Sequence, residues 1–596
     1  MNKRIVIVFA LMLVSLGAWA IPAYRGTFKY RQPDGSVIEL RRHGDEYFHW
    51  TTDLNGQVVS LDRDGYYRPS VLDKTQKKRA SLRRSAARTR QAAARVGNGN
   101  AMTRGQRHIP VILVSFQDKN FTVNDPKTKF NNLLNQQGYS YNGGNGSVRD
   151  YYKDNSHGVF EPVFDVYGPV KLPNNMAYYG ADEDEADAYK AVVDGAKLLD
   201  GEIDFSQYDA DNDGYVDMIL LYYAGFNEAE GGPEESIWPH QYTVNGQGGQ
   251  FDGKLLDAYF CTSELSGSEG STLCPIGTTA HEFGHSLGLP DFYDTDYEDN
   301  GQAGALYDFS LMCSGSYNDD GNTPPHFNAI ERQMLGWMQE EDVIELQEGE
   351  NAIPAIYKDV AYKLSTDVEG EFFLLETRDG SSWDKPLATG LVIYHVDQST
   401  QHMVSIGTGR DTKTVSANYL WTHWEYDNAI NENGSHPCFY VIPSGDPGNL
   451  WYHYDYRYGG EVYQIDEDSK KMVFPGQKRV KQYTPVTWDK HELGKTLVNI
   501  SYTASTSTSY VTLVQDGVTK DYYSIDCAST YKVGDKLALA LIEAEKDKAS
   551  SVSWKLDGKA VSGSVTFSAA GTYTLEAQLG YADGRKEVIE ALIVVK

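Results

Sequence analysis

The segment 278–291, TTAHEFGHSLGLPD, constrains the local fold more tightly than any other part of this chain. His281 and His285 are four residues apart, so on a helix their imidazoles project from the same face, one turn apart. The apolar spacing of residues 275–289 predicts such a helix, and Gly288 allows the sharp turn that ends it. One helix can then present two imidazoles to a single metal ion at about 2.0–2.1 Å.

The residues around this pair favour a catalytic metal site over a structural one. Glu282 lies where its carboxylate reaches a metal-bound water instead of the metal, and zinc lowers the pKa of that water towards about 7. Asp291, three residues after Gly288, supplies a third ligand and leaves the fourth position open. Asp294 and Asp296 remain alternative third ligands, although the spacing favours Asp291. The competing interpretation is an amphipathic helix with two surface histidines.

The first 20 residues have the pattern of a secretory signal peptide. Lys3 and Arg4 precede an apolar run over residues 5–16, and the small residues Ala18 and Ala20 indicate cleavage after Ala20. The run is shorter than the roughly 20 residues of a bilayer span, so an uncleaved membrane anchor is the less favoured alternative. No later stretch predicts a membrane span. We therefore expect a secreted protein, outside the cell or at its surface.

Charge divides the chain into a basic beginning and an acidic body. Residues 1–107 contain 20 Lys and Arg against 8 Asp and Glu, a net charge of +12, and the chain total of −29 leaves −41 on residues 108–596. Such an acidic body repels nucleic acid and anionic membranes, so a DNA or RNA partner is not expected. It suits a secreted protein that stays soluble and binds calcium.

Residues 21–107 have the features of a prosegment. The turn pairs Asp34-Gly35, Asn55-Gly56 and Asp64-Gly65 predict a small set of hairpins within residues 21–70. Residues 77–107 then contain ten basic residues and no acidic one. Exposed Arg-rich linkers are where secreted precursors are cleaved, so we expect processing here; the alternative is a solvated, partly helical linker.

The remaining chain predicts three further units. Residues 108–116 (HIPVILVSF) form an apolar run typical of a buried strand, and strands alternating with helices predict an α/β catalytic domain over 108–345. Residues 346–515 are rich in Tyr, Thr, Val and Gly and predict a β-rich domain. Residues 516–596 show strands at regular spacing around a candidate core residue, Trp554, and predict an Ig-like or PKD-like β-sandwich.

The cysteines are too few and too scattered for a disulfide scaffold. Cys261 and Cys274 flank a Gly/Ser-rich turn, and a disulfide between them is one alternative, free thiols the other. The five cysteines are Cys261, Cys274, Cys313, Cys438 and Cys527.

An acidic loop upstream of the helix predicts a second cation site. Oxygen side chains alternate along it, and Gly214 permits a tight turn, as in the first half of an EF-hand loop. Leu220 stands where an EF-hand has its twelfth-position Glu, so the pattern is incomplete; a solvated acidic turn is the alternative. The expected ligands of a structural Ca²⁺ are Asp209, Asp211, Asp213, Tyr215 through its carbonyl, and Asp217.

The extended pattern HExxHxxGxxD resembles the metzincin clan, whose members usually carry a third histidine where this chain has Asp291. With Phe292-Tyr293-Asp294 following, the sequence is similar to the immune inhibitor A group of secreted bacterial metallopeptidases, the M6 family. The resemblance covers most of the chain up to about residue 345. It implies a metzincin-like catalytic domain, one catalytic Zn²⁺ and hydrolysis of protein peptide bonds.

The resemblance also suggests roles for residues after the motif. Metzincins place a methionine in a tight turn beneath the metal, and Met312 in residues 310–316 (SLMCSGS) supplies one; the alternative is an ordinary core methionine. Tyr317 is either a donor to the oxyanion or a packed aromatic residue. His326 is interpreted as structural.

Residues 32–35 (QPDG) and 44–50 (GDEYFHW) look like the prosegment of this family. Many zymogens of the clan block the metal with a prosegment side chain. No cysteine occurs in residues 21–107, so a thiolate cannot act here. An Asp, Glu or His of residues 43–49, such as Asp45 or His49, is our hypothesis for this role.

The sequence thus predicts a multidomain, secreted zinc-dependent endopeptidase made as a zymogen, whose prosegment is an internal partner before processing. Its general base is Glu282 and its zinc ligands are His281, His285 and Asp291. The alternatives are a secreted adhesin or glycan-binding protein with a structural metal site, and a zinc hydrolase that acts on an amide other than a protein backbone.

Overall fold

The computed structural model describes the chain over residues 19–46, 48–71, 102–180, 188–244, 246–295, 305–400, 402–405, 417–419, 424, 429–433, 436–444, 456–458, 461–463, 469, 472–476, 480–515, 523–527, 530–542 and 548–595. Within these residues, none of the helices combines the length and the hydropathy that a membrane span requires. Residues 1–18 of the predicted signal peptide (1–20) and residues 72–101, which include most of the basic linker (77–107), lie outside the described residues.

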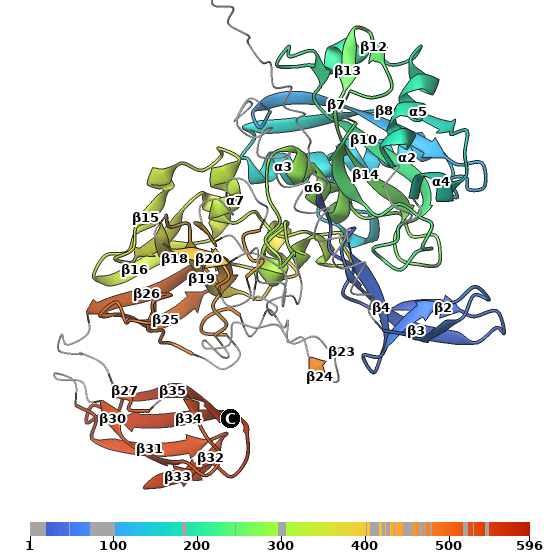
Figure 1. Cartoon of the computed structure of the whole chain (residues 1–596). Coiled ribbons are helices and arrows are strands. Elements are labelled where there is room, and N and C mark those ends of the chain that lie inside the picture. The colour runs from blue at the N-terminus through green and yellow to red at the C-terminus, as the bar shows by residue number, and fades with distance from the viewer. Residues whose placement is uncertain are drawn as a thin grey trace, which may run out of the picture.

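A six-stranded sheet forms the centre of the part of the chain that is predicted to be catalytic, hereafter the catalytic part (Figure 1). Its strands, in spatial order, are β1 (Trp19–Ala20), β11 (His240–Thr243), β14 (Ala258–Leu265), β10 (Ile219–Phe226), β7 (Gly105–Ser115) and β8 (Phe160–Lys171). Strands β14, β10, β7 and β8 run parallel, whereas β11 and β1 are added antiparallel at one edge. The apolar run at residues 108–116 therefore forms a buried strand, as predicted.

Helices cover both faces of this sheet. On β7, Val111 and Leu113 join one hydrophobic core, while Ile112 and Val114 join the other, because successive side chains point to opposite faces. Buried side chains of α2 (Pro126–Asn135), α3 (Val148–Asn155) and α6 (Ile276–Ser286) belong to the first core. Those of α4 (Met176–Gly180) and α5 (Ala188–Leu199) belong to the second.

Helix α6, which carries both histidines of the motif, is held at two points by its neighbours. Helix α3 starts with a capping box between Ser147 and Asp150, and its Tyr152 donates a hydrogen bond of 2.6 Å to the carbonyl of Ala280. In addition, Phe283 of α6 stacks on Phe260 of β14 at 5.4 Å between ring centroids. These contacts fix the rotation of α6 and so the direction of its polar face.

The N-terminal residues form a five-stranded meander that projects from the catalytic part as a separate lobe (Figure 1). Its strands are β2 (Phe28–Arg31), β3 (Val37–Gly44), β4 (His49–Asp53), β5 (Val58–Leu61) and β6 (Tyr67–Pro69). The hairpins predicted from the Asp-Gly and Asn-Gly pairs are therefore present. Glu228 of the catalytic part attaches the lobe, because it pairs with Arg42 at 3.5 Å and with His49 at 3.0 Å.

The chain after the catalytic part is built mostly from strands, as its composition predicts. One sheet has the order β15 (Val343–Glu345), β17 (Ala361–Ser365), β18 (Glu371–Arg378), β19 (Gly390–Asp397) and β22 (Phe439–Val441). A second has the order β16 (Gly349–Pro354), β26 (Thr508–Gln515) and β25 (Lys495–Thr503). Apolar residues of both sheets share one core, so these strands form one packed unit.

The last residues form a further set of sheets, drawn as a separate body in Figure 1. Trp554 packs half-buried against its core, close to the predicted role. The main sheet has the order β28 (Thr530–Tyr531), β35 (Lys586–Val595), β34 (Gly571–Gly580), β31 (Ser551–Leu556) and β32 (Lys559–Val561). Two further sheets have two strands each: β29 (Lys536–Ala538) pairs with β33 (Ser564–Thr566), and β27 (Ser524–Ile525) pairs with β30 (Leu541–Ile542).

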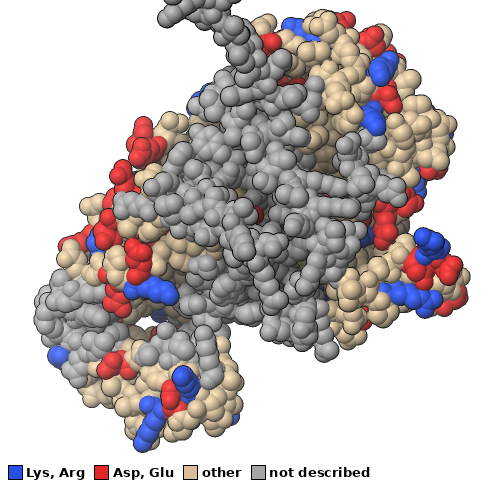
Figure 2. Space-filling model, in the orientation of Figure 1, with Lys and Arg blue, Asp and Glu red and all other residues tan. Residues whose placement is uncertain are grey.

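Shorter elements complete the described chain. They are α7 (Ala329–Met334), β9 (Tyr215–Val216), β12 (Gln250–Phe251), β13 (Lys254–Leu256), β20 (Met403–Ser405), β21 (Ala417–Tyr419), β23 (Tyr456–Tyr458) and β24 (Glu461–Tyr463). Acidic side chains are spread over the described part of the face in Figure 2, with Lys and Arg between them.

The bridge considered between Cys261 and Cys274 is not formed, because all five cysteines are free thiols. Cys261 Sγ lies 3.5 Å from His240 Nδ1, and Cys274 Sγ lies 3.6 Å from Thr262 Oγ1. Both thiols are buried, and this burial raises the pKa of each above its ordinary value. The two cysteines therefore act as small core residues.

The close approach of α6 to the turn below it gives a test of this packing. A Cβ on Gly277 would overlap the carbonyl oxygen of Ser316, so we expect Gly277→Ala to lower the free energy of unfolding by about 2–3 kcal/mol. Gly201→Ala is the matched control, since a Cβ there meets nothing within 4 Å. Chemical denaturation of both variants measures the difference; equal stabilities would contradict the packing of α6.

Candidate metal centre and active site

The structure brings His281, His285 and Asp291 together at one point. The two Nε2 atoms lie 3.0 Å apart, and Asp291 Oδ1 lies 3.4 Å from His281 Nε2 and 3.2 Å from His285 Nε2. All three side chains are buried. The two histidines come from α6, and the chain returns after Gly288, whose φ of +103° is the left-handed conformation expected at the end of the helix.

Two backbone carbonyls set the tautomer of both rings. His281 Nδ1 lies 2.8 Å from the carbonyl oxygen of Leu311, and His285 Nδ1 lies 2.8 Å from that of Leu289. A carbonyl only accepts hydrogen bonds, so each Nδ1 carries the proton and donates it. Each neutral ring therefore turns an unprotonated Nε2 towards Asp291.

This donor set fits a divalent cation. Two nitrogen lone pairs and a carboxylate oxygen converge within 3.0–3.4 Å, an arrangement that repels itself unless a positive charge lies between the atoms. Two imidazoles and one carboxylate with an open fourth position are the ligands of catalytic zinc. Zn²⁺ is therefore the cation that this set of side chains suits.

The electrostatics keep the ligands in the form that binds metal. Burial lowers the pKa of His285, so its ring stays neutral. The pKa of Glu282 is raised, chiefly by burial and further by the nearby Asp291.

Met312 lies directly beneath the ligand helix, as expected of the methionine turn. A Cβ on Gly284 of α6 would lie 2.8 Å from Met312 Sδ, so the thioether packs against the helix between its two histidines. The Met312 carbonyl also accepts a hydrogen bond of 2.9 Å from Phe292 N, next to Asp291. The turn thus supports the ligands on both sides.

An N-terminal segment lies against Glu282. The backbone N–H of Ile21 donates a hydrogen bond of 2.8 Å to Glu282 Oε1, and Ile21 is fully buried. Just before it, β1 pairs with β11 in the register Trp19 with Gln241 and Ala20 with His240. The N-terminal segment therefore crosses the candidate active site as an added edge strand.

Two aromatic side chains hold the same segment by its main chain. Trp238 Nε1 donates to the carbonyl of Ile21 at 2.9 Å, and Tyr317 Oη donates to the carbonyl of Pro22 at 2.8 Å. Burial raises the pKa of Tyr317 well above its ordinary value, so its hydroxyl remains a donor. Tyr317, which the sequence left open between two roles, thus faces a peptide carbonyl in the cleft.

The hypothesis that a side chain of residues 43–49 covers the metal needs correction. Asp45 accepts a hydrogen bond from the backbone of Phe48, and His49 pairs with Glu228 and stacks on Trp238 at 4.9 Å. It is the main chain of Ile21 that contacts Glu282. The meander supports the segment in the cleft through Trp238 instead of supplying a covering ligand.

The acidic loop brings together only part of the predicted calcium set. Asp209, Asp211 and Asp217 lie close enough to share one ion, whereas Asp213 turns Oδ1 to the backbone N–H of Tyr215 at 2.8 Å. Lys254 Nζ pairs with Asp209 Oδ2 at 2.5 Å and supplies positive charge there. The pKa of Asp217 is raised to about 6, first by burial and then by its acidic neighbours.

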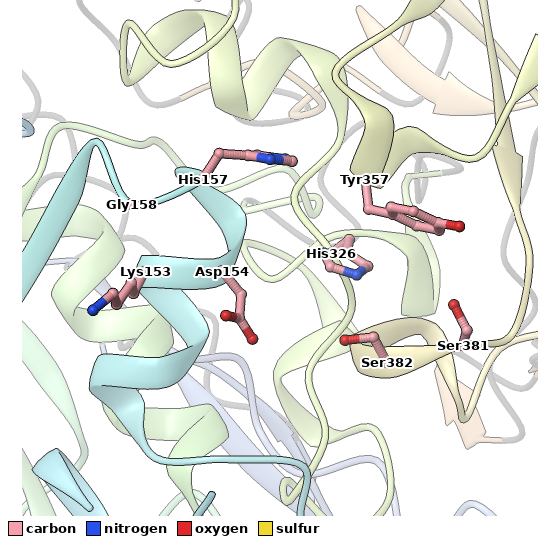
Figure 3. Close-up of a pocket in the computed structure, with 8 residues that line it drawn as sticks. All are labelled: Lys153, Asp154, His157, Gly158, His326, Tyr357, Ser381 and Ser382. Atoms are coloured by element: carbon pink, nitrogen blue, oxygen red, sulfur yellow. The ribbon is translucent and has the colours of Figure 1, made fainter. Parts of the chain in front are cut away.

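His326 lies away from the metal ligands and is structural, as predicted. Its Nδ1 lies 3.0 Å from Asn155 Oδ1, and burial lowers its pKa well below the ordinary value. It lines a separate cavity of about 460 Å³ between α3 and the strand-rich unit. Figure 3 shows the lining residues: Lys153, Asp154, His157, Gly158, His326, Tyr357, Ser381 and Ser382.

The sequence did not assign two residues that the structure places in the cleft. They are Trp238 and Ile21, which immediately follows the predicted signal-peptide cleavage after Ala20. Their contacts join residues more than 200 positions apart, which no spacing rule reveals. The residue after a predicted cleavage site was the one available signal.

Comparison with known proteins agrees with this geometry. The family described as "Immune inhibitor A peptidase M6, catalytic domain" matches residues 106–341. Immune inhibitor A of Bacillus thuringiensis subsp. alesti is 29% identical over 219 residues, which cover 32% of this chain and 31% of that protein. Pre-pro-metalloprotease PrtV of Vibrio cholerae serotype O1 (strain M66-2) is 27% identical over 241 residues, which cover 34% of this chain and 25% of that protein.

The similarity therefore spans less than a third of the length of either relative. Among solved structures, wild-type OgpA from Akkermansia muciniphila covers 84% of this chain and 95% of its own length, with 9% identity and a TM-score of 0.25. A score this low does not indicate a common fold over the whole chain.

The identity of the third ligand can be tested by stability. Zinc at 100 times its dissociation constant is expected to stabilise a chelator-stripped Glu282→Gln chain by about 2.7 kcal/mol, seen as a rise in Tm. Asp291→Asn should reduce this rise, because Asp291 Oδ1 faces both Nε2 atoms, and Asp294→Asn should keep it. The reverse result would assign the ligand to Asp294.

Proposed function

Residues 106–341 belong to the M6 peptidase family, and we propose on this basis that the protein is a secreted zinc-dependent endopeptidase made as a zymogen. The observation that carries the proposal is the convergence of His281 Nε2, His285 Nε2 and Asp291 Oδ1, with the carboxylate of Glu282 beside them. A structural metal site would use a fourth protein ligand instead of an open position.

Glu282 is suited to carry the proton in peptide hydrolysis. When bound, zinc lowers the pKa of water and polarises the scissile carbonyl. Glu282 Oε1 already accepts a main-chain N–H in the cleft, and Oε2 has no hydrogen-bond partner among the described residues. Its buried, raised pKa favours taking up a proton and passing it to the leaving amine.

The walls of the cleft are suited to hold an extended peptide. Strand β11 offers an unoccupied edge once β1 leaves, and an extended segment binds such an edge by main-chain hydrogen bonds. Trp238 Nε1 and Tyr317 Oη, which now hold the carbonyls of Ile21 and Pro22, would hold carbonyls of the substrate. Main-chain recognition of this kind fits protein substrates.

The role of Glu282 gives the main test of the proposed activity. We expect Glu282→Gln to keep zinc and fold but to lower casein hydrolysis by at least about 100-fold, since a positioned base contributes roughly 10²–10⁴-fold. Activity is measured on linker-cleaved protein, with and without chelator, and zinc content is measured on the same sample. Retention of more than about 1% of the activity would refute this role.

We propose that residues 21–23 keep the precursor latent. Ile21 N covers Glu282, its carbonyl binds Trp238, and Pro22 binds Tyr317, so the segment uses contacts that a substrate needs. Cleavage of the signal peptide after Ala20 would leave Ile21 as the first residue. Its nitrogen would then be an ammonium group 2.8 Å from Glu282 Oε1, which strengthens the contact through charge.

Latency can be tested by shortening the precursor. A chain that starts at Thr27 keeps strands β2–β6 but lacks this segment, and we expect it to cleave a small fluorogenic peptide before linker processing. We expect its rate to be at least about tenfold above that of a chain starting at Ile21. This difference corresponds to the loss of roughly 1.4 kcal/mol of binding between the segment and the cleft.

The linker-cleaved form of the longer chain serves as the control for a competent site, and gels confirm that the linker is intact in the test samples. If both uncleaved chains bind zinc but are equally inactive on the fluorogenic peptide, residues 21–26 do not cause latency.

The remaining organisation is part of the same proposal. We assign a metzincin-like α/β fold to residues 108–345, a β-rich domain to 346–515 and an Ig-like module to 516–596, with processing in the linker 77–107. A structural Ca²⁺ at the acidic loop is supported by the grouping of Asp209, Asp211 and Asp217. Calcium there would have to compete with the Lys254 ammonium.

A further inference from the structure

A second cluster of metal-ligating side chains lies in the strand-rich unit. Asp397 Oδ2 lies 2.6 Å from His402 Nδ1 and 2.9 Å from His436 Nε2, so two imidazoles meet one carboxylate oxygen. We infer that Asp397, His402 and His436 form a binding site for a transition-metal dication of the zinc type, separate from the catalytic centre.

Neighbouring groups orient the carboxylate and one imidazole of the cluster. The other carboxylate oxygen, Asp397 Oδ1, accepts a hydrogen bond of 3.0 Å from Ser399 N, which orients Oδ2 towards the histidines. On the far side of His402, Nε2 faces Asp489 Oδ2 at 3.5 Å. Nδ1 of His402 and Nε2 of His436 both face Asp397 Oδ2, so a bound dication would replace the protons that the two imidazoles share with the carboxylate.

The site is built into the fold but open to solvent on one side. The side chain of Asp397 is fully buried at the end of β19, whereas those of His402 and His436 are 14% and 17% exposed. The indole ring of Trp488 stacks on His436 at 4.1 Å and fixes its plane. A rigid carboxylate with two oriented imidazoles and an access route is what binding of a metal requires.

The position of the cluster gives the ion a structural role. Asp397 and His402 lie on one side of residues 403–435, and His436 lies on the other, so one ion would join the two ends of a long segment. Closing a long loop in this way removes conformational entropy from the unfolded chain and stabilises the folded one.

The same cluster is connected to the catalytic ligands. Trp424 Nε1 donates to the carbonyl of Asp397 at 2.8 Å, and the Trp424 ring lies 6.2 Å from that of Phe292. Asn431 Nδ2 donates to the carbonyl of Phe292 at 2.7 Å. Phe292 directly follows Asp291 in the chain. The second ion would therefore stabilise the residues that pack against Phe292, and through them the position of Asp291.

The experiment counts metal on a chain whose catalytic site is disabled. We expect full-length His281→Ala/His285→Ala protein, stripped and reloaded with Co²⁺, to retain about one equivalent after desalting and to show d–d absorption from imidazole coordination. Adding His402→Ala and His436→Ala should remove that equivalent and the absorption. The rise in Tm on adding Co²⁺ should disappear with them.

His491→Ala is the matched control, since His491 is also paired with a carboxylate, Asp367 at 2.9 Å, but has no second imidazole in its pair. It should retain the equivalent. Asp397→Asn keeps the shape of the side chain and should weaken cobalt binding if Asp397 is a ligand.

The inference is overturned if the His281→Ala/His285→Ala chain holds no cobalt after desalting, or if it holds the same amount when His402 and His436 are replaced. The first outcome overturns the inference even if the variant with all four histidines replaced does not fold. Neither result bears on the proposed peptidase activity, which is measured on chains with an intact catalytic site.

Discussion

Two hydrogen bonds from ring nitrogens to backbone carbonyls determine what the centre of this protein can do. Because the carbonyls of Leu311 and Leu289 accept from Nδ1, His281 and His285 must direct unprotonated Nε2 atoms at the same point as Asp291. Those carbonyls come from the turn of Met312 and from the bend after α6. The turn, the bend and the helix therefore have to fold together before the ligands converge, and their shared core with α3 enforces this.

The edge of the central sheet lies beside the segment that we propose to be inhibitory, and we propose that it also binds substrate. Strand β11 runs antiparallel to its neighbour β14 and leaves its outer edge for another strand. An exposed edge attracts any extended chain, and β1 covers this edge only while residues 19 and 20 are attached. The proposed inhibition by residues 21–23 and the proposed binding of a substrate would both use Glu282, Trp238 and Tyr317, so they would exclude each other.

Much of this arrangement was predictable from local pattern. The spacing of His281, His285 and Gly288 predicted the helix and its end, and the apolar run at 108–116 predicted the central strand, because both depend on neighbours in sequence. The segment at Ile21 was not predictable, since its contacts are made by main-chain atoms that carry no residue-specific signal. The cluster at Asp397 was missed for a related reason: His402 and His436 are too far apart for any motif, and only the folding of β19 beside β22 brings them together.

Cations, if bound, would also reduce the electrostatic repulsion that results from the acidic composition. With −41 charges on residues 108–596, the folded body repels itself, and this repulsion lowers its stability. At the acidic loop, Asp209, Asp211 and Asp217 form a group of carboxylates whose mutual repulsion a cation would remove. If the proposed ions bind, the stability of the protein would depend on the supply of metal. The coupling from Asp397 through Trp424 to Phe292 extends this dependence from the strand-rich unit to the catalytic ligands.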